Sequence, residues 1–230
     1  MSHCLVTGAN RGIGLEFVRQ LLARGDRVVA ACRQPGRALE LTRLAGAHPG
    51  HLRVLPLALP DTRSIAELVR EIGEPGFALD LLINNAGRLV SGERFGSIEA
   101  QALADSFATN AQGPLLLTQA LAPLLAPGAK VANLSSRLGS IEATAAFGTP
   151  SYAISKAALN MATRQLALAL APREVVVVAL SPGWVRTDMG GASAPLAPAD
   201  SARAMLALAG RLAARDSGRF LDLEGNPIPW

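Results

Sequence analysis

The sequence predicts an α/β protein: a doubly wound parallel β-sheet of about seven strands, with helices on both faces, in a single domain of residues 1–230. Two observations lead to this prediction. Short apolar stretches typical of buried strands alternate along the chain with longer stretches typical of helices. A glycine-rich turn joins the first of these strands directly to the first helix. The length of 230 residues, 50% of them hydrophobic, is sufficient for one large core.

The expected elements follow from these stretches. Strands are predicted at residues 4–7, 27–32, 52–59, 79–84, 130–135 and 175–180. Helices are predicted after the glycine-rich turn and at residues 62–72, 98–125 and 151–170. The second strand is continuously apolar rather than alternating, as expected for a parallel strand that is covered on both faces. Strands that are separated by helices in this way form parallel crossover connections.

The glycine-rich turn has the character of an anion-binding loop. Gly8 suits a tight turn, Gly12 lets a phosphate approach the backbone, and Gly14 allows the helix to pack closely on the sheet. In Rossmann-type folds, the N–H groups of such a turn and the N-terminus of the next helix bind a pyrophosphate. We therefore expect an NAD(P)-binding domain whose cofactor contacts in this turn are Gly8, Asn10, Arg11, Gly12, Ile13 and Gly14.

The residues after the second strand predict which dinucleotide binds. In NAD-binding proteins an acidic residue about 20 positions after the glycines holds the ribose 2′-hydroxyl, whereas this chain has Cys32 followed by Arg33. Arg33 and Arg11 can approach a 2′-phosphate from opposite sides, and charge-assisted hydrogen bonds are strong. The expected cofactor is therefore NADP(H). The alternative is that both arginines are solvated surface residues of an arginine-rich chain.

Tyr152 and Lys156 lie four residues apart, on one face of a predicted helix. A nearby ammonium group stabilises a phenolate, so Lys156 is expected to lower the pKa of Tyr152. Such a phenol can donate a proton to a developing alkoxide. On spacing alone, a pair of this kind is more often a surface pair. Polar residues elsewhere in the chain strengthen the catalytic interpretation.

These polar residues follow three later strands, at the edge where ligands bind in open α/β sheets. The fourth strand ends in NNAG at residues 84–87, the fifth in NLSS at 133–136, and the sixth in SPGWVRTD at 181–188. Asn110 lies within a predicted helix, where asparagine is unfavourable unless its amide makes specific bonds. Each feature alone is typical of a turn or a cap, but together they indicate a site.

In these motifs the chain resembles the short-chain dehydrogenase/reductase family over residues 4–189. The landmarks of that family appear in its order: TGANRGIG at 7–14, NNAG at 84–87, the serine at 136, YAISK at 152–156 and PGWVRT at 182–187. The stretch PGWVRTDMGG and the C-terminal FLDLEGNPIPW are similar to the subgroup of C-factor and sniffer-type carbonyl reductases.

The resemblance implies a role for each candidate residue. Tyr152 is the proton donor, Lys156 also binds the nicotinamide ribose, and Ser136, rather than the adjacent Ser135, bonds the substrate carbonyl. Asn110 holds a water on the proton path to Lys156. Further cofactor contacts are expected from Arg33, Leu59, Asn85, Ala86, Gly87, Tyr152, Lys156, Pro182, Gly183, Val185 and Thr187. At Leu59 only the backbone would serve, because the aspartate that relatives often place near the adenine is absent.

These roles predict an NADPH-dependent oxidoreductase that reduces a ketone or an aldehyde to an alcohol by hydride transfer. An alternative is a C-factor-like signalling or sensor protein that binds the dinucleotide with little or no turnover. A third possibility is epimerisation or dehydration, which generally occurs in longer chains. The substrate loop is expected near residues 189–199, where Gly190 and Gly191 can form a hinge.

Composition bears on the other partners. The formal net charge is +4 without any block of like charge, so nucleic-acid binding is not expected. With no signal segment and no apolar run of ~20 residues, the protein is expected to be cytoplasmic and not to bind membranes. Cys4 and Cys32 are expected to be reduced, and the three histidines lack partners at ligand spacing, so no metal site is predicted. The apolar surplus at Met161, Ala162 and Leu166 predicts a homodimer or homotetramer.

Overall fold

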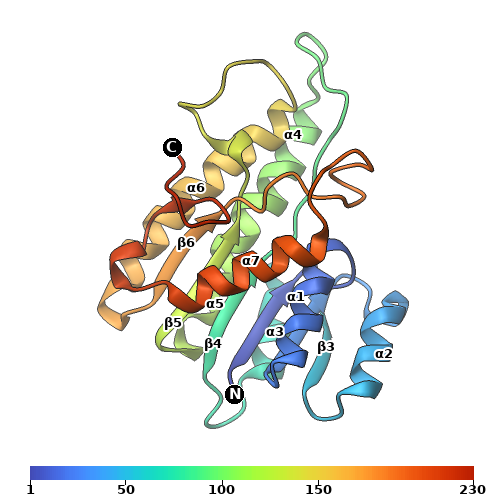
Figure 1. Ribbon diagram of the computed structural model, residues 1–230, viewed down its shortest axis with the longest axis vertical. Coiled ribbons are helices and arrows are strands. Elements are labelled where there is room, and N and C mark those ends of the chain that lie inside the picture. Colours follow the sequence, from blue (N-terminus) through green and yellow to red (C-terminus); the bar gives the residue numbers. More distant parts are fainter.

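A computed structural model describes residues 1–230, and its centre is one seven-stranded sheet with the order β3-β2-β1-β4-β5-β6-β7. All neighbouring strands are parallel. The strands are β1 (His3–Thr7), β2 (Arg27–Cys32), β3 (Leu52–Pro56), β4 (Leu79–Asn84), β5 (Leu125–Leu134), β6 (Val176–Leu180) and β7 (Phe220–Leu221). The predicted doubly wound parallel sheet is therefore confirmed (Figure 1).

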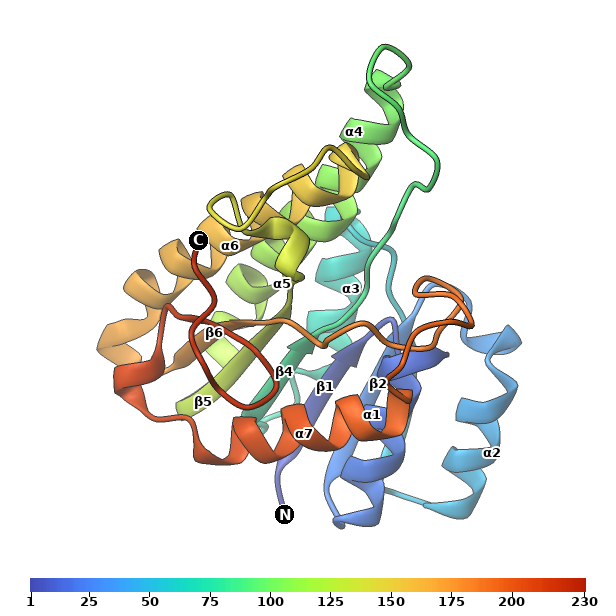
Figure 2. The same ribbon diagram turned by 45° about the horizontal axis from the view of Figure 1, so that its top comes forward.

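Helices cover both faces of the sheet (Figure 2). The α-helices are α1 (Gly12–Ala23), α2 (Leu39–Ala47), α3 (Thr62–Ile72), α4 (Ala100–Phe107), α5 (Gly113–Leu121), α6 (Pro150–Leu170) and α7 (Pro198–Arg211). One apolar core joins α1, α2 and α7 to the sheet, and a second joins α3, α5 and α6 to its other face. Alternate strand residues serve the two cores, because successive side chains of a strand point to opposite faces: Cys4 and Val6 contribute to the first and Leu5 to the second. None of the helices has the length and apolar character that a membrane span requires.

The register of the strands brings the sequence motifs to one edge. In the centre of the sheet, Asn84 at the end of β4 pairs with Asn133 of β5, and Leu134 pairs with Leu180 of β6. Because the strands are parallel, the segments that follow β1, β4, β5 and β6 all leave the sheet on the same side. The glycine-rich turn and the three polar segments are therefore neighbours in space, although they are far apart in the sequence.

Several boundaries differ from the sequence-based expectation. The expected helix at 98–125 is three segments, since α4 and α5 are joined by one turn of π-helix at Ala108–Gln112. Strand β3 ends at Pro56, and the Ala58 amide then bonds the Ser64 hydroxyl of α3 at 2.9 Å instead of another strand. Strand β5 begins at Leu125 rather than at residue 130. Helix α7 begins at Pro198, so the loop after β6 ends within the predicted 189–199 segment.

The edges of the sheet are closed in two ways. Strand β7 has only two residues, and the C-terminal tail returns beside it, with an antiparallel bridge between Leu221 and Pro227. The Ile228 amide also donates to the Phe220 carbonyl at 2.8 Å. At the other edge, Arg53 of β3 pairs with two glutamates of the α3 region at 3.0 Å.

Helix α6 has an exposed apolar stripe. Ile154, Met161 and Leu168 are each more than half exposed, and their spacing of seven residues places them on one side of the helix. Ala162 and Leu166, which the sequence assigned to the same surplus, are instead buried against the sheet. The unpartnered surface of α6 is therefore narrower than expected and consists of the larger side chains.

Candidate active site

The glycine-rich turn after β1 is packed tightly against the end of β4. Gly8 has φ +63°, and a Cβ there would lie 2.8 Å from the Cα of Ala86. A Cβ on Gly14 would lie 2.5 Å from the Nδ2 of Asn85 and would also collide with the Gly8 carbonyl. Gly14 thus permits the turn to fold onto itself, in addition to the helix packing that the sequence suggested. Only glycine can occupy either position without displacing the backbone.

Hydrogen bonds hold the same two strand ends together. The Thr7 hydroxyl accepts from the backbone N–H groups of Asn85 and Ala86, both at 3.0 Å. In return, the Asn85 side chain donates to the carbonyls of Thr7 at 2.9 Å and Gly8 at 3.2 Å. The NNAG segment and the glycine-rich turn therefore form one rigid unit.

This unit fits the pyrophosphate of a dinucleotide. Helix α1 begins there without a side-chain cap and without an acidic residue in its first turn, so its N-terminus is open to an anion. Gly12 has φ +55°, and a Cβ there would lie 3.3 Å from the Thr187 methyl group. Thr187 of the segment after β6 thus borders the turn. Asn10 is exposed here, and Ile13 packs on the core under α1.

At the adenosine end of the expected cofactor site, the two predicted arginines have different surroundings. Arg33 is exposed directly after β2 and forms no ion pair. Arg11, the second arginine expected near a 2′-phosphate, is instead paired with Asp188 at 2.6 Å. Both side chains of this pair are largely exposed, so the pair is weak and can exchange partners. The Leu59 side chain packs close to Gly113 at the start of α5.

Tyr152, Lys156 and Ser136 come together at the ends of β5 and α6. Tyr152 and Lys156 are 9% and 4% exposed, and the Lys156 ammonium lies 5.5 Å from the centre of the phenol ring. The ammonium donates a hydrogen bond of 2.5 Å to the Leu134 carbonyl. Gly139 allows this close approach, because a Cβ there would lie 2.8 Å from Lys156. The pair is therefore buried at the site and is not a surface pair.

The two serines after β5 have different surroundings. Ser135 is buried, and its hydroxyl donates to the Asn160 side chain at 2.6 Å. Ser136 is half-buried, and its hydroxyl is near enough to the Tyr152 phenol to lower the phenol pKa. The hydroxyl of Ser136, not that of Ser135, is thus the one beside the phenol.

Asn110 occupies the π-helical turn and is fully buried. Its side chain accepts from the Arg88 amide at 2.7 Å and donates to the Arg88 carbonyl at 2.8 Å and the Ser155 hydroxyl at 2.9 Å. A Cβ on Gly87 would lie 3.5 Å from the Asn110 side chain and 3.8 Å from the Lys156 ammonium. Asn110 thus binds the loop after β4 to the helix that carries Tyr152.

A hydrogen bond from α7 holds the start of the segment that follows β6. The Ser201 hydroxyl of α7 donates to the Pro182 carbonyl at 2.7 Å, and Gly183 has φ +77°. Val185 is buried and forms a bridge with Leu196. Pro182, Gly183, Val185 and Thr187 therefore follow one path along the carboxyl edge of the sheet, beside the glycine-rich turn.

Comparison with known proteins agrees with this geometry. Residues 2–195 match the family model described as short chain dehydrogenase. The chain belongs to the short-chain dehydrogenase family. It is 46% identical to "C-signal" of Myxococcus xanthus over 156 residues, which cover 66% of this chain and 93% of that protein. It is also 33% identical over the full length of both chains to 1-hydroxy-2-glutathionyl-2-methyl-3-butene dehydrogenase of Rhodococcus sp. (strain AD45).

Solved structures of this short-chain dehydrogenase family superpose over the whole chain. Carbonyl reductase Sniffer of D. melanogaster has a TM-score of 0.95 with 34% identity, covering 100% of both chains. An NADPH-bound carbonyl reductase from chicken fatty liver has a TM-score of 0.95 with 40% identity, covering 100% of this chain and 99% of the other. The resemblance to C-factor and sniffer-type reductases is therefore confirmed.

The pKa of the dehydrogenase phenol differs from the sequence-based expectation. Burial raises the pKa of Tyr152 to about 12, and the hydrogen bond from Ser136 lowers it only in part. Burial also lowers the pKa of Lys156 to about 8, since an ammonium group is costly to desolvate. The expected lowering of the phenol pKa by Lys156 is thus absent from this structure. Desolvation of the phenol is the dominant cause, and the phenol is held in its protonated form.

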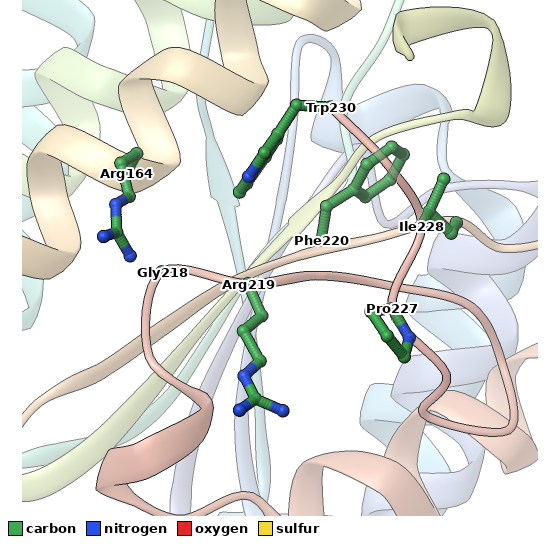
Figure 3. A pocket seen from close by; sticks show the side chains of 7 residues that line it. All are labelled: Arg164, Gly218, Arg219, Phe220, Pro227, Ile228 and Trp230. Carbon is green, nitrogen blue, oxygen red and sulfur yellow. The ribbon is translucent and has the colours of Figure 1, made fainter. Parts of the chain in front are cut away.

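Four large apolar side chains in the segments after β5 and β6 are exposed. Ile141, Phe147, Trp184 and Met189 are all at least 42% exposed, and the Trp184 indole donates to the Gly190 carbonyl at 2.8 Å. A separate cavity of about 470 Å³ lies at the C-terminal tail. It is lined by Arg164, Gly218, Arg219, Phe220, Pro227, Ile228 and Trp230 (Figure 3). None of the predicted site residues borders this cavity.

The sequence missed the residues that hold the dehydrogenase site in place. Ser155 and Asn160 of α6 bind Asn110 and Ser135, respectively. Asn160 is one helical turn beyond Lys156, which is a usable signal because one helix face then carries several polar residues. Glu93, which bonds Ser151 beside Tyr152, has no such signal, since 58 residues separate it from its partner.

We expect the buried ammonium of Lys156 to make stability depend on pH. Its folded pKa of about 8 lies below the ordinary lysine value of 10.5, so between these values the unfolded chain holds a proton that the folded chain has lost. Stability relative to a Lys156→Met variant should therefore rise by about 2 kcal/mol from pH 7 to pH 9.5. Tyr152 contributes little there, because burial keeps the folded phenol protonated and the unfolded phenol, with an ordinary pKa of ~10, is still mostly protonated at pH 9.5.

Urea unfolding of both proteins at the two pH values measures this difference. Lys130→Met is the matched control, since Lys130 is only partly buried, and its pH-dependent change should be smaller. A difference between wild type and Lys156→Met that stays constant with pH would contradict the expectation.

Proposed function

We propose that this short-chain dehydrogenase is an NADPH-dependent carbonyl reductase that converts a ketone or an aldehyde to an alcohol. The observation that carries the proposal is the buried group of Tyr152, Lys156 and Ser136 beside the glycine-rich turn. The likeness over full length to an NADPH-bound carbonyl reductase, at 40% identity, supports the choice of reaction and cofactor.

The bound cofactor would supply hydride to the carbonyl carbon. The glycine-rich turn and the start of α1 would hold its pyrophosphate, and Lys156 its nicotinamide ribose. Ser136 would orient the carbonyl oxygen, and the phenol of Tyr152 would donate the proton that the developing alkoxide needs. The phenol is protonated at neutral pH, and because burial raises its pKa to about 12, transfer of its proton depends on the stronger basicity of the alkoxide that forms. The Asn110 side chain would keep α6 in register with the loop after β4.

Exposed apolar side chains in the segments that follow β5 and β6 favour an apolar substrate. The exposed side chains of Ile141, Phe147, Trp184 and Met189 offer apolar contacts, and none of them carries a charge. Aldehydes, ketones and quinones with hydrophobic substituents meet this requirement. A panel of such compounds, followed by the loss of NADPH absorbance, would identify the class.

The similarity to "C-signal" favours a second candidate function, a dinucleotide-binding sensor with little turnover. A protein that only binds the dinucleotide has no need of a buried phenol next to Ser136. We therefore place the reductase first. Binding of NADPH without consumption of any carbonyl compound would favour the sensor instead.

Tyr152→Phe is expected to reduce kcat by about 10²–10⁴-fold, because it removes the transferable proton and keeps the packing of the ring. The dissociation constant of NADPH should stay nearly unchanged, since the phenol is not the main contact of the dinucleotide. Steady-state kinetics with a ketone or aldehyde that the wild type reduces measure the effect on kcat. Fluorescence titration with NADPH measures the dissociation constant. Turnover comparable to wild type would remove Tyr152 from the mechanism.

We expect kcat/KM to be at least about tenfold higher with NADPH than with NADH, because Arg33 can make a charge-assisted bond to the 2′-phosphate. Because Arg11 must exchange Asp188 for the phosphate whereas Arg33 has no ion-pair partner, the larger share of this preference should depend on Arg33. Arg33→Ala should lower the ratio by about tenfold, whereas Arg37→Ala, an exposed arginine in the next turn, should not. Equal kcat/KM of the wild type with NADPH and NADH would contradict a 2′-phosphate site at Arg33.

We further propose that the chain forms a homodimer or homotetramer through the exposed stripe of α6. Ile154, Met161 and Leu168 expose a continuous apolar surface that another copy can cover. Met161→Glu should shift the mass seen by light scattering at micromolar concentration to that of a monomer. Leu39→Glu, at an exposed apolar residue on α2, is the control that should leave the mass unchanged. A monomeric wild type would contradict the proposal.

A further inference from the structure

The helix that carries Tyr152 is not capped by its own neighbouring residues. Thr149 occupies the cap position in a left-handed conformation, with φ +42°, and its side chain makes no capping bond. Pro150 is the first residue of α6 and has no N–H group. The first helix amide that needs an acceptor is therefore that of Ser151, the residue directly before the phenol.

A carboxylate from a distant loop supplies this acceptor. Glu93, between β4 and α4, accepts from the Ser151 backbone N–H at 3.1 Å and, through its other oxygen, from the Ser151 hydroxyl. Ser151 is 1% exposed, so water does not compete for these groups. A negative charge at a helix N-terminus is also favoured by the helix dipole. Glu93 therefore caps α6 in place of a local residue.

The loop that carries Glu93 is attached to the site at two further places. Asn110 binds the Arg88 backbone near its beginning. Farther along, the ring of Phe95 meets that of Phe147 edge-on, with centroids 6.0 Å apart. Phe147 lies just before α6, and Figure 1 shows the two loops, in green and yellow, extending beyond the sheet on the same side. Because the loop is anchored on both sides of Glu93, the carboxylate has a defined position.

We propose that Glu93 is a positioning residue of the reductase: by capping α6 at Ser151, its carboxylate fixes the first turn of the helix and thereby the Tyr152 hydroxyl. This inference rests on the proposed function for its effect on turnover. Glu93 bonds only Ser151, so it acts through the helix rather than on the substrate. Without the carboxylate, the buried Ser151 amide lacks an acceptor, and the first turn must shift or open to water.

The test compares three single variants in carbonyl reduction. Glu93→Ala should lower kcat by about ten- to a hundredfold, as expected for a misplaced catalytic group, while KM for NADPH changes by less than about twofold. Glu93→Gln keeps an acceptor for the amide and should restore most of kcat. Glu99→Ala is the matched control, because Glu99 is an exposed glutamate of the same loop whose side chain makes no capping bond. Equal losses in Glu93→Ala and Glu99→Ala would overturn the proposal.

A second measurement does not depend on turnover. Tyr152 is the only tyrosine of the chain, so the ultraviolet absorbance of phenolate reports on this residue alone. If Glu93 keeps the first turn closed, Glu93→Ala should lower the phenol pKa from about 12 toward its ordinary value, and Glu93→Gln should not. An unchanged titration in Glu93→Ala would overturn the proposal even if no carbonyl substrate were found. A wild-type protein without turnover, but with the expected titrations, would instead disprove only the reductase function.

Ser151→Ala completes the set, and where Glu93→Ala does not fold, a loss of kcat in Ser151→Ala that exceeds the loss in Glu99→Ala tests the capping contact. It removes the hydroxyl and keeps the backbone N–H, so its loss of kcat should be smaller than that of Glu93→Ala. In the double variant, Ser151→Ala should cause no further loss, because the bond between the Ser151 hydroxyl and Glu93 is already gone. Independent, multiplicative losses would show that Glu93 does not act through Ser151.

Discussion

The site depends on the burial of one ammonium group. Lys156 of α6 is 4% exposed, and its ammonium donates to the carbonyl of Leu134 at the end of β5. A charged group removed from water needs such an acceptor, and the helix must come very close to the strand to provide it. This approach requires glycine at position 139, where any Cβ would meet the helix backbone. Burial of the neighbouring phenol of Tyr152 follows from the same packing.

Buried polar bonds give α6 a single register on the sheet. Asn133 of β5 donates to the Thr163 hydroxyl at 2.9 Å, and Ser135 bonds Asn160 one turn earlier. A shift of the helix by one residue would leave these polar groups without partners in the core, which is far costlier than the same shift in an apolar interface. Specificity of packing in the middle of α6 therefore comes from hydrogen bonds, whereas its first turn depends on Glu93.

The sequence predicted what local patterns determine. The strand at 27–32 and the helix at 62–72 have the predicted bounds, because continuous apolar residues and a strong amphipathic pattern mark them. The π-helical turn at Asn110 could not be predicted from the sequence, because the Asn110 side chain bonds the Arg88 backbone in another loop. The pKa of Tyr152 was predicted in the wrong direction because spacing reveals a charged neighbour but does not reveal how deeply both groups are buried.

The closed edges of the sheet have a consequence for how copies of this chain meet. A long open edge strand is a template for adding a strand from another molecule, which leads to aggregation. Here one edge strand has two residues backed by the C-terminal tail, and the other carries Arg53 with its glutamate partners. Strand addition is therefore disfavoured at both ends. Crowding at high concentration should bring molecules together through side chains on their helices, in contacts that separate again on dilution.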